Sequence, residues 1–450
     1  MTLLAVSMLA AGCSTIQVQR PAATPATAAM NATFARAGEL ARQDTTLSGQ
    51  AQQDNRARIA QLLAGLDNAT LAREAAALPE NDPLYNFAGH ALLDRGLPLP
   101  RPFDRSAAHF DVGNRPPADR DGYRPPIKLG VLLPLSGALS RAAVPVRDGL
   151  LAGYYGESRR RPEIVFYDTA GTPNGAIAAY RRAVSEGADD MIGPLGRDEV
   201  SALFREPLTV PVLALNRGNV PPPAGSTSFS LAPEDDAIAA AEFVLARSAR
   251  HVLVLGDDSL SRAVTAFAEH LKQRGGDVTI LNVPAKPGDM SAGLQAAAQK
   301  PGGIDAVFLA LKPVQARALA PQLAAAGLAG KPRVSTSQLA AVDAGTANRV
   351  LDGIAFPSEA WNVTNVPGLP SPAAAAKTLP SARAGAARLF AFGHDAWLLT
   401  AYLERLATQV DGTVQGATGT LRLDGFGNIA RTPAWSTFSG GSVVPLGNTP

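Results

Sequence analysis

The chain has 450 residues, which is long enough for two or three domains and a sizeable hydrophobic core. Its 41 basic and 39 acidic side chains leave a formal net charge of +2. This near-balance gives no electrostatic reason to expect nucleic acid, or an anionic membrane surface, as a partner. Composition therefore favours a globular, multidomain protein whose partners must be inferred from its motifs.

The amino terminus contains the chain's single cysteine, Cys13, at the end of a short apolar run from Thr2 to Ala11. Such a run is too short for a membrane-spanning helix, which needs about 20 residues. The sequence LAAGC resembles the bacterial lipobox, in which the cysteine is lipidated, so residues 1–13 are predicted to be a lipoprotein signal peptide. Acyl chains would then attach the protein to a membrane. The alternative is a buried cysteine in a hydrophobic helix.

Three segments are predicted between the signal peptide and the first strand. Residues 14–48 are rich in Thr, Ala and Pro at their start and are interpreted as a flexible tether. Residues 49–96 contain three short stretches with helical spacing and are predicted to form a small helical module. Residues 97–126 contain seven prolines and are interpreted as a linker or an irregular wrap.

From Ile127 onward, short apolar runs alternate with amphipathic stretches. The first run is Ile127 to Leu133, and its helix places Val146, Leu150 and Tyr154 on one face. Further strands are predicted at 163–168, 190–196 and 210–216, and a second set at 251–258, 277–285 and 304–311. Alternation of this kind predicts parallel sheets with right-handed crossovers. A helix is also predicted at 392–406 and a hairpin at 418–431.

These elements predict an α/β fold with two lobes, each a parallel sheet flanked by helices, with a cleft between them. The two sets are expected to join near Ser230 to Pro233. The predicted boundaries are 127–231 plus 360–416 for lobe 1, and 232–359 plus 417–450 for lobe 2. Ligands of open α/β sheets bind at the carboxyl ends of strands, which places a candidate site at the turn PLSG after the first strand.

The order of motifs resembles the type I periplasmic binding proteins. It includes IKLGVLLPLSG, DTAGTPNGA, MIGPLGRDEV, VPVLALN, GHDAWLLTAYLERL and GTLRLDGFGNI. Within that superfamily, a lipoprotein with these segments is similar to the penicillin-binding-protein activators of the LpoA type, over roughly residues 125 to 446. The resemblance implies an outer-membrane lipoprotein on the periplasmic face that stimulates a bifunctional peptidoglycan synthase. One departure is that family members carry a large helical-repeat amino-terminal domain, whereas only the short segment before residue 97 could play that part here.

The resemblance also implies candidate ligand-binding positions at the strand ends of the cleft. They are Ser136, Gly137, Thr169, Gly196, Arg197 and Asn216. Arg197 could bind a carboxylate with two parallel hydrogen bonds. The alternative is that Ser136 and Gly137 only shape a turn and that Arg197 is solvated.

Two further positions carry an open choice. Asp257, next to Asp258, could bind an amine, or it could cap the helix that begins near Ser259. Trp361, near Glu359, could be an exposed anchor for a partner, or it could be packed in a hinge between the lobes.

No motif for catalysis or metal binding is present. There is no HExxH, GxSxG or GxxxxGK[ST], and the five histidines are isolated in the sequence. The chain is therefore predicted to be a non-enzymatic regulator of cell-wall synthesis with no cofactor and no metal. The main alternative is a solute-binding sensor or transport lipoprotein for an amino acid or a cell-wall fragment. A third possibility is an envelope hydrolase whose Ser, His and Asp assemble only in space.

Overall fold

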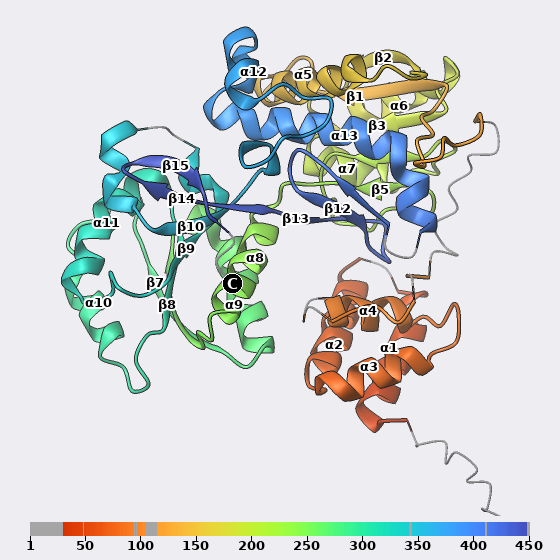
Figure 1. Cartoon of the computed structure of the whole chain (residues 1–450). Coiled ribbons are helices and arrows are strands. Elements are labelled where there is room, and N and C mark those ends of the chain that lie inside the picture. The colour runs from red at the N-terminus through yellow and green to blue at the C-terminus, as the bar shows by residue number, and fades with distance from the viewer. Residues whose placement is uncertain are drawn as a thin grey trace, which may run out of the picture.

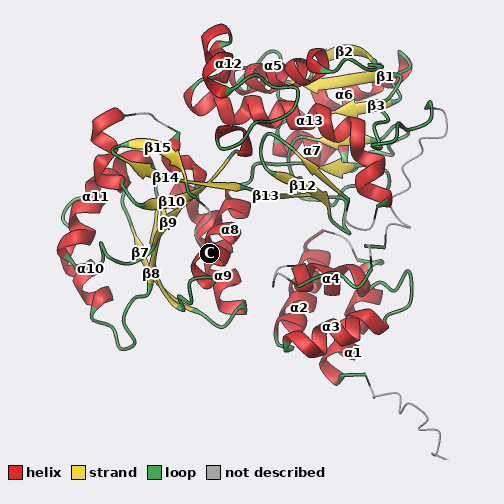
Figure 2. Ribbon diagram, in the orientation of Figure 1, coloured by secondary structure: helices red, strands yellow, loops and turns green. Residues whose placement is uncertain are grey.

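The computed structural model describes residues 30–47, 49–93, 95, 97–101, 103–104, 115–341, 344–409 and 412–447. Cys13 and the first half of the predicted tether lie outside these residues. Within them, a small helical module precedes two α/β lobes that lie side by side (Figures 1 and 2). None of the described helices is both long enough and apolar enough to cross a membrane.

The helical module has its own hydrophobic core. Four of its large side chains are each at most 1 % exposed and belong to one hydrophobic cluster: Phe34, Leu63, Leu71 and Tyr85. Its four helices are α1 Ala32–Asp44, α2 Gly49–Ala64, α3 Asn68–Ala77 and α4 Tyr85–Leu93. The predicted tether over 14–48 is therefore wrong where α1 forms. Small residues at the buried positions of α1 conceal its helical period in the sequence.

The segment 97–126 connects the module to lobe 1, and its described residues contact both. Its described residues contain no helix or strand. Arg101 ties it to the module, because its Nη1 donates to the carbonyl of Leu78 at 2.7 Å. Tyr123, which is 3 % exposed, packs into the core of lobe 1 and donates its hydroxyl to the carbonyl of Arg160 at 2.7 Å. The wrap interpretation of the proline-rich segment fits these contacts.

Lobe 1 contains a five-stranded parallel sheet in the order β2-β1-β3-β4-β5. Val131 at the centre of β1 pairs with Phe166 of β2 and Ile192 of β3. The strands are β1 Lys128–Leu133, β2 Glu163–Asp168, β3 Asp190–Ile192, β4 Val212–Ala214 and β5 Thr227–Ser228. The helices between them are α5 Ser140–Gly156, α6 Pro173–Ser185 and α7 Arg197–Leu203.

Lobe 2 contains a seven-stranded sheet in the order β15-β14-β10-β9-β8-β6-β7. The five strands from β6 to β10 are parallel, and β14 and β15 add an antiparallel edge. The strands are β6 His251–Gly256, β7 Asp277–Asn282, β8 Ala306–Ala310, β9 Arg333–Ser335, β10 Ile354–Ser358, β14 Ala434–Ser439 and β15 Ser442–Pro445. The helices are α8 Pro233–Leu245, α9 Ser261–Gln273, α10 Ser291–Ala298 and α11 Pro313–Ala325.

The chain crosses between the lobes three times, between β5 and α8, between β10 and α12, and between β13 and β14. The first crossing lies where the sequence predicted it. After the second crossing, α12 Pro372–Thr378 and α13 Ala384–Thr408 return to lobe 1. The long helix α13 lies against α5 (Figure 1). Glycine makes this approach possible, since a Cβ on Gly149 would lie 1.8 Å from the carbonyl oxygen of Phe390.

A third, antiparallel sheet packs against the core of lobe 1. It consists of β11 Thr413–Gln415, β12 Thr420–Leu423 and β13 Ile429–Thr432, and it contains the predicted hairpin. Leu421, Leu423 and Ile429 pack into the core of lobe 1. The assignment of all of 417–450 to lobe 2 is therefore wrong for β12 and β13, because their apolar side chains face the first lobe. Only β14 and β15 join the second.

Candidate functional site

A cavity of about 370 Å³ lies between the two lobes. Lobe 1 and α13 supply one wall and the first turns of α8 and α9 supply the other. Its polar and aromatic lining includes Arg197, Asn216, Arg217, Glu234, Arg262 and Phe392. Two of the predicted residues, Arg197 and Asn216, thus line a shared space between the lobes.

Arg197 is exposed at the start of α7, and its Nε lies 3.4 Å from Oδ1 of Asn219. Asn216 uses its amide to hold the loop, because its Nδ2 donates to the carbonyl of Leu195 at 3.0 Å. The opposite wall carries an ion pair between Arg262 and Glu234, at 3.3 Å. A carboxylate entering the cavity would meet the guanidinium groups of both walls.

Ser136 and Gly137 shape the loop after β1. The hydroxyl of Ser136 donates to Oδ2 of Asp168 at 2.7 Å, and this bond and backbone amides hold the pKa of that carboxyl below its usual range. Gly137 has a φ of +78°, and a Cβ there would lie 2.5 Å from the carbonyl oxygen of Ala170. The turn-shaping alternative therefore describes the contacts of this pair.

Thr169 and Gly196 meet a buried carboxyl group, Glu199. The amide of Gly196 donates to Oε2 of Glu199 at 2.7 Å, and Glu199 is 1 % exposed. Burial raises the pKa of Glu199, while hydrogen bonds from Thr169 and Gly196 oppose that shift. These contacts brace the edge of the sheet, and neither residue is among the described residues that line the cavity.

Asp257 lies apart from this cavity and caps the turn Asp258–Leu260 at the start of α9. Its Oδ1 accepts from the amide of Ser259 at 2.9 Å, and its Oδ2 accepts from Nε2 of Gln315 at 2.7 Å. Burial would raise its pKa, but the bonds from Ser259 and Gln315 hold the pKa below its usual value. The capping alternative thus describes Asp257.

Trp361 is 2 % exposed, so an exposed anchor at this position is wrong and the packed alternative holds. Its ring stacks on Phe390 of α13 with centroids 5.3 Å apart, and its Nε1 donates to the carbonyl of Pro370 at 2.9 Å. A large aromatic side chain next to a crossover fills the core beneath it.

A buried ionic network joins the lobes and was not predicted from the sequence. Its centre is Asp236 of α8, which is 0 % exposed. Oδ1 of Asp236 accepts from Nη2 of Arg431 in β13 at 2.8 Å, and its Oδ2 lies 3.3 Å from Nη2 of Arg388 in α13. Burial would raise the pKa of Asp236, but Arg388 and Arg431 hold it below its usual range.

A second ion pair runs beside this network. Arg217, after β4, makes two hydrogen bonds to Asp235 of α8, at 2.7 and 3.0 Å. Both ion pairs therefore connect lobe 1 to the first helix of lobe 2. The only local signal in the sequence is the acidic run PEDD at the start of that helix, since the arginine partners are distant in the chain.

Among the residues that the structure describes, no group of three or more His, Cys, Asp or Glu side chains is placed to hold a metal ion. The decisive comparison is with protein families. The family model described as "LppC putative lipoprotein" matches residues 123–441, which include both lobes. The chain belongs to the LppC family.

The LppC match extends to curated relatives. A protein from Yersinia pseudotuberculosis named "Penicillin-binding protein activator LpoA" is 28 % identical over 334 residues, covering 63 % of this chain and 50 % of its own length. A protein of the same name from Photobacterium profundum is 27 % identical over 351 residues, covering 70 % of this chain and 56 % of its own length. The LppC chain thus spans about half the length of the curated relatives it matches.

Solved structures show the same fold. The C-domain of LpoA (YraM) from Haemophilus influenzae, described as a regulator of PBP1A, aligns with a TM-score of 0.60 at 23 % identity, over 71 % of this chain and 99 % of its own. Full-length LpoA from that organism aligns with a TM-score of 0.62 at 20 % identity, over 92 % of this chain and 78 % of its own. These likenesses confirm the predicted periplasmic-binding-protein-like fold with amino-terminal helices.

One further solved structure shares the fold of the two lobes. A protein from Chromobacterium violaceum described as a "putative branched-chain amino acid ABC transporter" is 31 % identical, with a TM-score of 0.56, over 69 % of this chain and 100 % of its own.

Proposed function

We propose that this chain is a non-enzymatic regulator that binds a peptidoglycan synthase, a bifunctional penicillin-binding protein, and raises its activity. The observation that carries the proposal is the match over both lobes to the LppC family and to relatives named penicillin-binding protein activators. The match covers only about half of those relatives' own length, so the activity of the whole relative is carried over as a proposal.

The contacts between the lobes support a binding role that needs no closure around a ligand. Asp236 is held by arginines from α13 and β13, and Arg217 holds Asp235. Opening the lobes would break these charge-assisted hydrogen bonds, each of which contributes about 1.5–3 kcal/mol. A body with fixed lobes can present one surface to a synthase and favour its active conformation through differential affinity.

We further propose attachment to the outer membrane, on its periplasmic face, through acyl chains on Cys13. The support is the LAAGC motif, membership of a lipoprotein family, and Ser rather than Asp after the cysteine. Mass spectrometry of the protein from cells, combined with separation of inner and outer membranes, tests this. Unacylated Cys13, or acylated protein in the inner membrane, contradicts the proposal.

The function is tested by adding the chain from Ser14 onward to the purified cognate synthase. We expect direct binding and faster glycan polymerisation, peptide cross-linking or both, since each is a reaction of the synthase alone. Lysozyme-like turnover by the chain itself would contradict the non-enzymatic role. No binding and no change in either rate would remove the proposed function.

The likeness to the Chromobacterium violaceum protein and the 370 Å³ cavity favour a second candidate, binding of an amino acid between the lobes. Its test is titration with leucine while the melting temperature is followed. A ligand that binds only the folded chain stabilises it in proportion to RT ln(1 + [L]/Kd). A dose-dependent rise that Arg197→Gln abolishes would support this candidate, and no rise would exclude leucine.

A further inference from the structure

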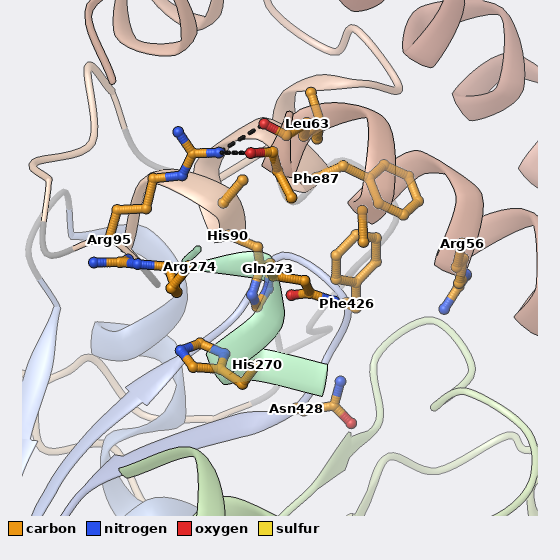
Figure 3. Close-up of a pocket in the computed structure, with 13 residues that line it drawn as sticks. Arg56, Leu63, Phe87, His90, Arg95, His270, Gln273, Arg274, Phe426 and Asn428 are labelled. Carbon is orange, nitrogen blue, oxygen red and sulfur yellow. Dashed lines mark hydrogen bonds between the residues drawn. The ribbon is translucent and has the colours of Figure 1, made fainter. Parts of the chain in front are cut away.

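A second cavity, of about 280 Å³, lies where the helical module meets the rest of the chain (Figure 3). Three separate parts of the chain line it. The module contributes residues of α2 and α4, lobe 2 contributes the end of α9, and the hairpin of lobe 1 contributes Phe426 and Asn428. The cavity therefore exists only while the module is docked.

The docking itself depends on the tip of the hairpin. The ring of Phe426 lies 4.7 Å from that of Phe87 and 5.2 Å from that of His90, measured between centroids. The guanidinium of Arg56 lies 5.2 Å from the Phe426 ring. Beside it, Nδ2 of Asn86 donates to the carbonyl of Gly425 at 2.8 Å. One aromatic side chain and one amide thus align the module with the cavity.

The lining combines aromatic rings with basic groups. In the view of Figure 3, Arg95 and Arg274 lie on the left, Phe87 and Phe426 lie to their right, and Arg56 lies beyond the two rings. Leu63, Ala60, Ala64 and Ala91 add apolar surface. None of the described lining residues is acidic. A ligand that fits this arrangement of rings and guanidinium groups has a flat apolar body and a negatively charged end.

The two arginines on the left of the cavity, Arg95 and Arg274, both make contacts within the protein. Arg95 donates to the carbonyls of Leu63 and Leu66, both at 2.7 Å, and so caps the end of α2. Arg274 lies farther from its carboxylate, with Nη1 at 3.6 Å from Oε1 of Glu242. Gln273 is exposed beside it. A ligand carboxylate would share Arg274 with Glu242, and the amide of Gln273 would be a second donor.

Three carboxylates pair with residues that line the cavity. Asp44 binds Arg56 at 2.8 Å, Glu242 lies 2.5 Å from Nε2 of His270, and Asp424 lies 3.5 Å from Nε2 of His90. These carboxylates pair with basic residues of the lining, and none of the three lines the cavity itself. This balance suits a ligand with a single negative charge better than one with several.

We propose that this cavity binds a small aromatic carboxylate, with its ring against Phe87 and Phe426 and its carboxylate on Arg274. The volume of about 280 Å³ lies just below the range for small-molecule sites, about 300–1,000 Å³, which limits the ligand to about one ring. Because its walls come from the module and from both lobes, the bound ligand favours the docked module. This inference does not depend on the proposed synthase partner.

The test uses phenylacetate as the probe and phenylacetamide as its uncharged counterpart, each titrated by calorimetry into the chain from Ser14 onward. Phenylacetate is expected to bind saturably, and phenylacetamide at least tenfold more weakly, because a hydrogen-bonded charge is lost. Hydrogen exchange is expected to slow in α2, α4 and the end of α9 when phenylacetate is present. No saturable binding of phenylacetate up to about 10 mM overturns the proposal.

Two variants locate the site. Arg274→Gln is expected to weaken phenylacetate binding at least tenfold, whereas Lys272→Gln, on the same helix and outside the lining, leaves it unchanged. Gly425→Ala is expected to abolish binding without altering a lining residue, because the new Cβ would lie 2.5 Å from Cγ of Asn86 and displace the module. Gly288→Ala, where a Cβ meets nothing within 4 Å, is its control. Equal binding by Arg274→Gln and the unaltered chain overturns the assignment.

Discussion

Two internal boundaries of this molecule are built in opposite ways. The boundary between the lobes is crossed three times by the chain and contains buried ion pairs at Asp235 and Asp236. The boundary between the helical module and the lobes depends on Phe426 and Asn86 and is bordered by cavities of about 280 and 400 Å³. Buried ion pairs hold the first boundary beside the cavity of about 370 Å³, whereas the second is held by one aromatic ring, one amide and the pair of His90 with Asp424.

The contacts at the two boundaries indicate which parts of the molecule can move. Separating the lobes would break the charge-assisted hydrogen bonds of Asp235 and Asp236, so the lobes are expected to move as one body. Separating the module breaks few contacts, and its core is complete without the lobes. The module is therefore the part that can change position while the lobes keep theirs. Each prediction below tests one side of this contrast.

The largest effect is expected from Asp236→Asn. This change keeps the shape of the side chain but leaves buried Arg431 without a carboxylate and leaves Arg388 with Glu359 alone, at 3.2 Å. The free energy of unfolding is expected to fall by about 3–5 kcal/mol, measured by urea denaturation. The control is Glu163→Gln, which removes a pair between Lys128 and the exposed Glu163 at 3.2 Å and is expected to cost about 0.5 kcal/mol or less. Equal losses would contradict the importance of the network.

Gly425→Ala is expected to have the next largest effect, and only on the module. The clash of the new Cβ with Asn86 is expected to cost about 1–3 kcal/mol of docking free energy. Small-angle scattering should show a larger radius of gyration, while circular dichroism keeps the helical signal. Gly288→Ala is expected to leave both unchanged. A lower melting temperature of the lobes, with the module still docked, would show that the boundary is stronger than described.

The pH dependence of docking should follow Asp424. Burial would raise its pKa, but His90, Asn428 and backbone amides hold the pKa below its usual value. A carboxyl group with a lowered pKa stabilises the folded form above its unfolded pKa, about 3.9, and loses this contribution as the pH falls below it. Docking is thus expected to persist from about pH 5 to 7 and to weaken below about pH 4. Asp424→Asn should remove this acid-dependent loss, measured by scattering across pH.

The smallest effect is expected from Arg197→Gln. Arg197 is exposed and makes one long contact, to Asn219 at 3.4 Å. Its replacement should change the free energy of unfolding by no more than about 0.5 kcal/mol. A larger loss in urea denaturation would mean that the cavity between the lobes contributes to the rigidity now assigned to Asp236.

Local patterns in the sequence predicted much of the fold. The strand Glu163–Asp168 matches its predicted range, and the hairpin of β12 and β13, at 420–432, overlaps the predicted 418–431. These elements have their own apolar period and turn residues. Helix α1 was missed because Ala37 and Ala41 occupy its buried positions beside Phe34, and alanine gives little contrast in a hydrophobicity pattern.

The sites were less predictable, because their parts are distant in the chain. Asp236 and Arg431 are separated by 195 positions, and no local spacing connects them. Arg197 and Asn216 share a cavity as predicted, since both follow strands of one parallel sheet. For Phe426 the sequence contained one signal, which is an apolar ring in a turn of glycines and Asn. A solvent-exposed hairpin would not need such a ring. Trp361 shows the converse, because a large ring after a strand can equally fill a core.

The account depends most on the two lobes being one rigid body. Spin labels at Arg205→Cys and Lys272→Cys, exposed positions on lobe 1 and lobe 2, would report their separation in a chain beginning at Ser14. Electron–electron resonance should give one narrow distance distribution that leucine and the synthase both leave unchanged. A broad or two-peaked distribution that leucine narrows would contradict the account and favour a protein that closes around a solute.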